Sequence, residues 1–296
     1  MLFGINAMNR KILILGANGM AGHILTTGLR EDLTCFDVIS VARTNSIIEP
    51  DLLLDVSNFK ELESLVKNTK PEIIINCVGI LNKTAEQNPD NAILINAYLP
   101  HFLESMTMNS KTRVIHISTD CVFSGKEGNY TENSFKNGIG YYAQSKALGE
   151  IINKKDLTLR TSIIGPELNA DGIGLFHWFY NQSENIKGFT NAFWTGVTTV
   201  ELLNAIKIAI NENLVGLYHL VNSRKISKFQ LLNLMKIEFK RDIKILPDDT
   251  YKIDKSLLNN RNDFSYIVKD YNEMLKEMHL WIKTHKNIYS NYGTIL

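Results

Sequence analysis

The 296-residue sequence has few cysteines, no long apolar run and no excess of charge of one sign. Cys35, Cys77 and Cys121 stand far apart without a CxxC pair, which argues against disulfides and paired metal ligands and favours reduced thiols. No apolar run approaches the roughly 20 residues that span a bilayer. No basic segment followed by a long apolar run opens the chain, so no secretory signal is visible. We expect a cytoplasmic protein without membrane contact.

The charges nearly cancel. The 32 Lys and Arg residues almost balance the 31 Asp and Glu residues, so no global field would attract nucleic acid. The histidines form no HExxH or other tight ligand set, and we expect no metal site. His116, inside an apolar run, is expected to be a hydrogen-bonded core residue. The Lys and Glu residues after Lys225 are interpreted as solvated helix faces.

Apolar runs alternate with helix-length segments through the first half of the chain. Five runs predict buried strands, at 11–15, 36–42, 72–79, 113–118 and 157–164. Helical patterns occur at 20–29, 59–68, 93–106 and 142–152. Such alternation is typical of βαβ crossovers, whose buried parallel strands are continuously apolar. It predicts a Rossmann-type, doubly wound parallel α/β sheet.

The regular alternation of apolar runs and helical segments ends after residue 165. Residues 166–196 are rich in Gly, Asn and aromatics, and are followed by a predicted helix at 199–211 and a strand at 216–221. Further helical runs, at 228–239 and 267–284, are separated by polar loops.

These segments predict two parts. A nucleotide-binding Rossmann domain covers 8–165, with 197–222 returning to it, and a smaller mixed substrate-binding lobe is built from 166–196 and 223–296. Residues 1–7, which precede a second methionine, are expected to be an extension without a structural role.

A glycine-rich turn directly follows the first predicted strand. Gly16, Gly19 and Gly22 have the spacing Gly-x-x-Gly-x-x-Gly, with Asn18 and Met20 in the same turn. Glycines let the backbone approach a pyrophosphate, which the free N–H groups of a helix N-terminus bind. With a strand before it and a helix after it, the motif predicts a dinucleotide site; an ordinary strand–helix turn is the alternative.

The tip of the second strand indicates which cofactor binds. A carboxylate there would bind the ribose of NAD, but the strand ends in Arg43, which suits the 2′-phosphate of NADP(H). A solvated surface arginine is the alternative, and NAD(H) stays open. Asp55 and Val56 could border the adenine, although Asp55 also fits a turn or a helix N-cap.

The sequence Tyr-x-x-x-Lys offers a proton donor. Of two adjacent tyrosines, only Tyr142 stands four residues before Lys146, on the same helix face. We expect the ammonium group to lower the pKa of the phenol, which could then protonate a carbonyl oxygen as hydride arrives. Thr119, at the end of the fourth strand, could hydrogen-bond that oxygen, with Ser118 as its competitor.

At these residues the chain resembles the extended short-chain dehydrogenases, and within them the dTDP-4-dehydrorhamnose reductase (RmlD-like) family. The resemblance covers most of 11–222 and is carried by GANGMAG, STDCVFSGKEGNYTEN, YYAQSKALGE, LRTSIIGPE, TTVELLNAI and GLYHLVNS. It implies that Thr119, Tyr142 and Lys146 are catalytic.

The resemblance also implies cofactor contacts. Gly16, Gly19 and Gly22 would hold the pyrophosphate and Arg43 the 2′-phosphate, while Cys77, Val78 and Gly79 would line the cofactor after the third strand and Asn96 would brace the site. The chain departs from the family pattern at Cys121, where a tyrosine is usual, at 76–79, which replace a run of alanines, and at Ile163, where an aromatic is common.

Four residues are assigned to the substrate: Asp120, Phe123, Asn169 and Trp194. The aromatic run at 175–180 could close over a sugar or a base, or could equally form a packed helix.

These observations predict an NADPH-dependent reductase of a nucleotide-linked 4-keto-6-deoxy sugar, of the kind that supplies surface polysaccharides. Two alternatives remain. The first is an epimerase or dehydratase of the same fold, against which Cys121 counts because a dehydratase would carry a second acid there. The second is a non-catalytic regulatory subunit. We expect a nucleotide-sugar partner, and a homodimer stays open.

Overall fold

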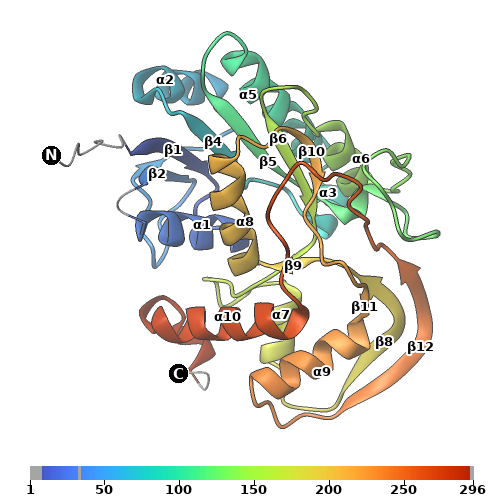
Figure 1. Cartoon of the computed structure of the whole chain (residues 1–296). Helices are drawn as coiled ribbons and strands as arrows, with labels where there is room; N and C mark the ends of the chain where they lie inside the picture. The colour runs from blue at the N-terminus through green and yellow to red at the C-terminus, as the bar shows by residue number, and fades with distance from the viewer. Residues whose placement is uncertain (1–8, 33–34, 294–296) are drawn as a thin grey trace, which may run out of the picture.

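A seven-stranded parallel sheet forms the centre of the larger part of the molecule (Figure 1). The computed structural model describes residues 9–32 and 35–293, so the expected extension at 1–7 lies outside the described residues. The strand order is β10-β6-β5-β4-β1-β2-β3. The bounds are β1 Arg10–Leu15, β2 Phe36–Ala42, β3 Leu52–Leu53, β4 Ile73–Asn76, β5 Arg113–Thr119, β6 Leu157–Thr161 and β10 Gly216–His219.

This order confirms the predicted Rossmann-type sheet. From β1 the chain first builds outward to β2 and β3, and then crosses back to β4 and continues to β10. The direction in which successive strands are added to the sheet therefore reverses between β1 and β4. Ligands of open α/β sheets bind at the carboxyl ends of the strands beside such a switch point.

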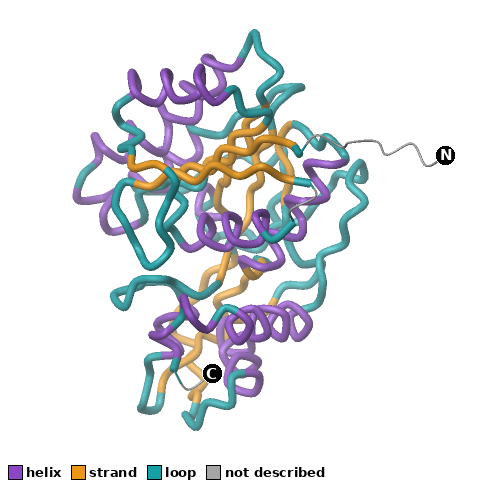
Figure 2. Tube along the Cα trace, turned by 90° about the vertical axis from the view of Figure 1, so that its left-hand side faces the viewer, coloured by secondary structure: helices purple, strands orange, loops and turns teal. Residues whose placement is uncertain are grey.

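Helices cover both faces of the sheet, as Figure 2 shows. Along β1, Ile12 and Ile14 join the apolar cluster that includes α1 (Met20–Arg30) and α8 (Thr199–Asn211). Leu13 and Leu15 join the opposite cluster, with α2 (Phe59–Thr69) and α5 (Leu99–Thr107). Alternate residues of a strand point to opposite faces, so a strand buried on both sides is apolar throughout.

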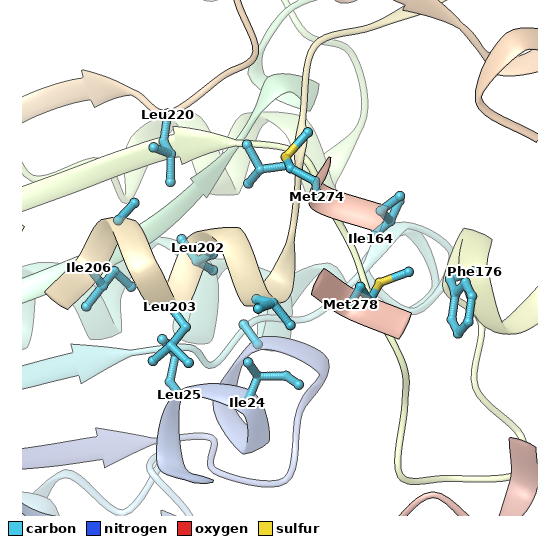
Figure 3. Packing of buried hydrophobic residues seen from close by; sticks show 14 of the residues in the cluster. Ile24, Leu25, Ile164, Phe176, Leu202, Leu203, Ile206, Leu220, Met274 and Met278 are labelled. Carbon is cyan, nitrogen blue, oxygen red and sulfur yellow. The ribbon is translucent and has the colours of Figure 1, made fainter. Parts of the chain in front are cut away.

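The larger of these clusters extends out of the sheet domain (Figure 3). Leu203 of α8 lies so close to α1 that a Cβ on Gly28 would be 2.2 Å from its side chain. Met274 and Met278 of α10 (Tyr271–Thr284) belong to the same cluster, together with Phe176 of α7 (Leu175–Tyr180). One continuous core therefore joins the two parts.

A second, three-stranded sheet supports the smaller part, shown below the main sheet in Figure 1. β8 (Ile186–Trp194) is central, with β11 (Ile226–Ser227) antiparallel and β12 (Ile245–Asp254) parallel to it. α9 (Lys228–Glu238) packs against β8. Two short strands, β7 (Ile163–Ile164) and β9 (Val197–Thr198), pair beside them. The remaining elements are α3 Asn82–Gln87, α4 Pro89–Ala92, α6 Tyr141–Leu148, a π-helix at Ile93–Tyr98, and short 3-10 turns at Asp120–Val122, Lys286–Ile288 and Ser290–Tyr292.

Several predicted elements were wrong in extent. The strand predicted over 157–164 is two strands, because the carbonyl of Ser162 accepts a hydrogen bond from Val197 N and draws the following residues to β9. The helix predicted to reach residue 152 ends at Leu148, where Gly149 passes the backbone of Asn96 so closely that a Cβ would be 1.9 Å from its carbonyl oxygen.

Besides the two-residue strands β3, β9 and β11, two long strands were missed altogether. The Gly- and Asn-rich stretch around residue 190 is β8, and the supposed polar loop after α9 contains β12. Gly188 of β8 is buried because the backbone of Phe229 lies over it, with Cα 2.8 Å from where a Cβ would stand. A buried glycine carries no hydrophobic signal, which hides the alternating pattern of such a strand.

Within the described residues, no helix combines the length and apolar character needed to cross a membrane. The same residues contain no cluster of three or more His, Cys, Asp or Glu side chains arranged to bind a metal ion.

Candidate functional site

The glycine turn after β1 requires glycine at two positions for different reasons. Gly16 has φ of +81°, in the left-handed region that side chains disfavour. A Cβ on Gly22 would lie 2.0 Å from the carbonyl oxygen of Gly16, so α1 could not approach the turn with any larger residue. The close approach aims the N-terminus of α1, which begins at Met20, at the switch point.

A cavity of about 400 Å³ opens at this turn. Residues that follow four strands line it, and eight of them were predicted as cofactor contacts: Gly16, Asn18, Gly19, Arg43, Asp55, Val56, Val78 and Gly79. Asn18 donates a hydrogen bond to the carbonyl of Thr44 (2.7 Å), whereas its Oδ1 is buried without a partner. This unpartnered oxygen lies in the glycine turn, beside the N-terminus of α1. It could accept a hydrogen bond from a bound dinucleotide.

The edge of the cavity carries both charges that were predicted to face the adenosine. Asp55 accepts hydrogen bonds from Ser57 N (2.9 Å) and Ser57 Oγ (2.7 Å), and these bonds, together with the charge of Arg43, lower the pKa of Asp55. Asp55 is thus a turn residue that also borders the cavity, while Asn58 is the N-cap of α2. Arg43 is exposed and lines the cavity.

Met20, Gly22 and Cys77 do not line this cavity. The side chain of Met20 points toward the segment before α7, because a Cβ on Gly174 would be 2.4 Å from the methyl carbon of Met20. Cys77 is close enough to Lys146 for their charges to interact.

Thr119 and Tyr142 meet beside the switch point. Thr119 ends β5, Tyr142 lies in the first turn of α6, and the two side chains are close enough for Thr119 to lower the pKa of the phenol. Thr119 Oγ1 also donates to Asp120 Oδ1 (3.2 Å) and accepts from Cys121 N (3.1 Å). Ser118 instead donates to Glu150 (2.7 Å), which holds its hydroxyl away from this pair.

The predicted effect of Lys146 on Tyr142 was wrong. Burial raises the pKa of Tyr142 well above its usual value, Cys121 and Asp120 raise it further, and only the neighbouring Thr119 opposes them. Lys146 itself donates to the carbonyl of Ile117 (2.6 Å), and burial lowers its pKa to about 8. Burial thus disfavours the charged form of both groups: it lowers the pKa of the Lys146 ammonium group and keeps the Tyr142 phenol protonated.

Asn96 lies in the π-helix and joins three segments. Its Oδ1 accepts from Ile80 N (2.8 Å), and its Nδ2 donates to the carbonyl of Ile80 (2.9 Å) and to Ser145 Oγ of α6 (3.1 Å). The predicted helix over 93–106 did not include this wider turn, which is common at functional sites. Asn96 therefore holds the catalytic helix against the chain after β4.

A second cavity, of about 390 Å³, lies between the end of β5 and the smaller sheet. Of the predicted substrate contacts, Asp120 and Trp194 line it, and Trp194 belongs to β8 rather than to a loop. Phe123 is buried, and borders a smaller cavity that Tyr142 also lines. Asn169 is exposed and lines neither cavity.

The aromatic run at 175–180 forms α7, and its residues divide between the two predicted roles. Phe176 and Phe179 are fully buried in the core, whereas Trp178 lines the second cavity.

Three lysines that line this cavity were not predicted: Lys187, Lys228 and Lys255. Lys228, interpreted as part of a solvated face, is enclosed, and its Nζ lies 5.0 Å from the centre of the Trp194 ring. Burial lowers the pKa of Lys228 to about 8, against the opposing charge of Asp120. Ser227 caps the N-terminus of α9, but no local pattern shows which way the next side chain points.

The chain is similar to proteins of known family. The family model described as the RmlD substrate binding domain matches residues 10–254. The chain is similar to dTDP-4-dehydrorhamnose reductase of Aggregatibacter actinomycetemcomitans, with 29% identity over 158 residues that make up 51% of each protein. The alignment thus spans about half the length of that relative.

Two further proteins are similar over more of their length. Methionine adenosyltransferase 2 subunit beta of Xenopus tropicalis is 24% identical over 244 residues, which cover 78% of this chain and 72% of that protein. The crystal structure of dTDP-4-dehydrorhamnose reductase from Bacillus anthracis, in complex with NADP, superposes with a TM-score of 0.80 and 23% identity, covering 93% of this chain and 99% of that one.

Proposed function

This chain belongs to the RmlD substrate binding domain family, and from that membership we propose that it is an NADPH-dependent reductase of a nucleotide-linked 4-keto-6-deoxy sugar. The observation that carries the proposal is the approach of Thr119, at the end of β5, to Tyr142 of α6, which lines a cavity that adjoins the second one through Cys121 and Lys255. A carbonyl held there would meet a proton donor and, from the side of the glycine turn, a dinucleotide.

The residues of the site suit reduction. NADPH, when bound, would supply the hydride to C4 of the sugar. Because the pKa of Tyr142 is raised, its phenol stays protonated at neutral pH and can donate to the carbonyl oxygen. Thr119 would hydrogen-bond the same oxygen and stabilise its developing charge. Lys146 would hold the hydroxyls of the nicotinamide ribose.

Three features support NADP(H) as the cofactor. The glycine turn and the orphaned Oδ1 of Asn18 fit a dinucleotide, and Arg43 at the end of β2 fits the 2′-phosphate. The similar reductase from Bacillus anthracis was crystallised with NADP. That protein and the similar Aggregatibacter enzyme are both named dTDP-4-dehydrorhamnose reductases, which supports a nucleotide-linked keto-sugar as the substrate.

The test is to incubate the protein and NADPH with a panel of 4-keto-6-deoxy sugars linked to dTDP, UDP, GDP or CDP, and to follow NADPH oxidation. At least one sugar should be reduced, and Tyr142→Phe should lower kcat by about two to four orders of magnitude without loss of NADPH binding. Full turnover by Tyr142→Phe with every accepted sugar would disprove the mechanism.

A second candidate, a non-catalytic regulatory subunit, is favoured by the likeness to methionine adenosyltransferase 2 subunit beta. The approach of Thr119 to Tyr142 at the end of β5 argues against it. Tight NADPH binding without reduction of any sugar in the panel would favour this alternative.

A further inference from the structure

His116 is fully buried in β5 and has no part in the mechanism above. Its ring lies between two polar side chains from neighbouring elements. Nδ1 is 3.2 Å from Nδ2 of Asn76, the last residue of β4, and Nε2 is 3.3 Å from Nζ of Lys146 in α6. The histidine therefore connects the end of a strand at the switch point with the lysine of the catalytic helix.

The orientation of Asn76 decides which ring nitrogen carries the proton. Val78 N donates to Oδ1 of Asn76 (3.1 Å), so the NH₂ group of Asn76 faces His116. Turning the amide over would set two donors against each other at Val78. Nδ1 of His116 must then accept from Asn76. Burial lowers the pKa of His116 well below its usual value, so the ring is neutral and its one proton is on Nε2.

The N–H on Nε2 consequently points at Lys146. An ammonium group has only donors to offer, whereas an amine has a lone pair that can accept this N–H. Both forms can donate to the carbonyl of Ile117, so that bond does not distinguish them. We propose that His116, oriented by Asn76, is a positioning residue that favours the amine form of Lys146 over its ammonium form.

The other ionisable groups near Lys146 do not provide a free counter-ion. Glu150, two residues beyond the end of α6, is bound by Arg160 through two hydrogen bonds of 2.7 and 2.8 Å and by Lys136 at 3.1 Å. Cys77, after β4, is a neutral thiol because burial raises its pKa to about 12. The lack of a free counter-ion agrees with the pKa of Lys146, which is lowered to about 8.

The role of this contact in turnover rests on the proposed reductase function. When the O–H bond of Tyr142 breaks and its proton goes to the carbonyl oxygen of the sugar, a phenolate remains. The phenolate must then regain a proton. Lys146 lies one turn further along the same helix, and its ammonium form would supply this proton by way of an intervening hydroxyl group or water, the resulting amine taking a proton from water. A lysine that exists in both forms near neutral pH can give and regain this proton readily.

The direct test is a pH titration of Lys146 by NMR on the whole protein with ¹³C-labelled lysine, the signal being assigned with Lys146→Arg. We expect a wild-type midpoint near 8. In His116→Gln, whose amide oxygen can accept from an ammonium, the midpoint should rise by about one pH unit. His285→Gln, the same change in a histidine that binds Glu31 instead, should leave it unchanged. A wild-type midpoint near the ordinary ~10.4, or one that His116→Gln does not move, would overturn the proposal.

Asn76→Asp gives a second test that does not remove the histidine. Its carboxylate would accept from Nδ1, which moves the proton off Nε2 and leaves a lone pair facing Lys146. The midpoint of Lys146 should again rise, and an unchanged midpoint in a folded Asn76→Asp protein would contradict the tautomer argument.

Turnover separates this proposal from the proposed function. If a keto-sugar is reduced, the pH profile of kcat should shift to higher pH in His116→Gln. If no sugar is reduced but the NMR midpoints move as expected, the contact between His116 and Lys146 stands and the reductase assignment fails.

Discussion

At the scale of single residues, the candidate site depends on charges placed where water is largely excluded. Lys228 shows this most clearly, because it contacts the Trp194 ring and shares a cavity with Asp120. A buried cation of lowered pKa stays charged more easily when an anion or a polar ligand reaches it. We therefore expect Lys228 to bind an oxygen of the substrate.

The substitution Lys228→Met keeps the aliphatic stem and removes the charge. It should raise the KM for the nucleotide sugar by about tenfold, which corresponds to ~1.4 kcal/mol, and leave the KM for NADPH unchanged. Lys252→Met, on an exposed position of β12 in the same sheet, is the matched control and should change neither value. Equal effects of the two substitutions would show that Lys228 does not contact substrate.

Also at the scale of single residues, we expect Arg43 to determine which cofactor binds. Removing its guanidinium in Arg43→Ala should raise the KM for NADPH by about tenfold or more, while the KM for NADH changes little, because only NADPH carries the 2′-phosphate. Steady-state kinetics with both cofactors measure the ratio. Lys60→Ala, an exposed position of α2, serves as the control. A parallel loss with NADH would mean that Arg43 acts on the fold rather than on the phosphate.

At the scale of elements, close backbone contacts place the catalytic groups. The Cβ that Gly149 lacks would overlap the carbonyl of Asn96, so α6 can end directly against the π-helix that Asn96 belongs to. This contact, together with the bond from Asn96 to Ser145, sets the position of the helix that carries Tyr142 and Lys146. The sequence predicted both segments as helices but could not show that they touch.

The contact of α1 with the glycine turn gives a test at this scale. In Gly22→Ala the new methyl group would lie 2.0 Å from the carbonyl oxygen of Gly16, so helix and turn must separate. We expect a loss of about 1–3 kcal/mol in the free energy of unfolding, measured by urea denaturation, and weaker NADPH binding by titration. Gly293→Ala, where the nearest atom would be 3.8 Å away, should do neither. Wild-type stability and affinity in Gly22→Ala would refute the packing argument.

At the scale of the whole molecule, buried histidines join segments far apart in the sequence. His23 of α1 donates from Nδ1 to the carbonyl of Gly19 (2.9 Å) and bonds through Nε2 to the hydroxyl of Tyr289 (2.8 Å) near the C-terminus. His219 of β10 accepts from Arg160 of β6 (2.7 Å) and donates to the carbonyl of Leu258 (2.7 Å). Burial lowers the pKa of each to about 4.

These histidines should make the protein sensitive to acid. Each is neutral when folded but takes up a proton near pH 6.5 when unfolded, so its contribution is complete above that pH and is lost as the pH falls toward 4. The loss could reach ~3 kcal/mol for each histidine. Urea unfolding between about pH 7 and about pH 4.5 should show a smaller decrease in His23→Gln than in the wild type. Identical pH dependence of the two proteins would contradict the assignment of His23 as a buried neutral group.

Much of the fold followed from local pattern. The strands β1, β2 and β5 and the helices α1, α2 and α8 were predicted to within a residue or so, because a strand buried on both faces is apolar throughout and an amphipathic helix repeats with its own period. The domain boundaries near residues 165 and 222 stay a prediction, as do the roles of the site residues.

The sequence by itself determined which chemical groups stand at the ends of strands and on one helix face: the glycine turn, Thr119, and the pair Tyr142 and Lys146. Those positions depend on neighbours only a few residues away, so spacing is enough to read them. Only the tertiary structure decided that Lys228 and Asp120 line one cavity, that burial raises rather than lowers the pKa of Tyr142, and that His116 meets Lys146. Each of these depends on the burial and contacts that arise when segments distant in the sequence pack together, and no local pattern records them.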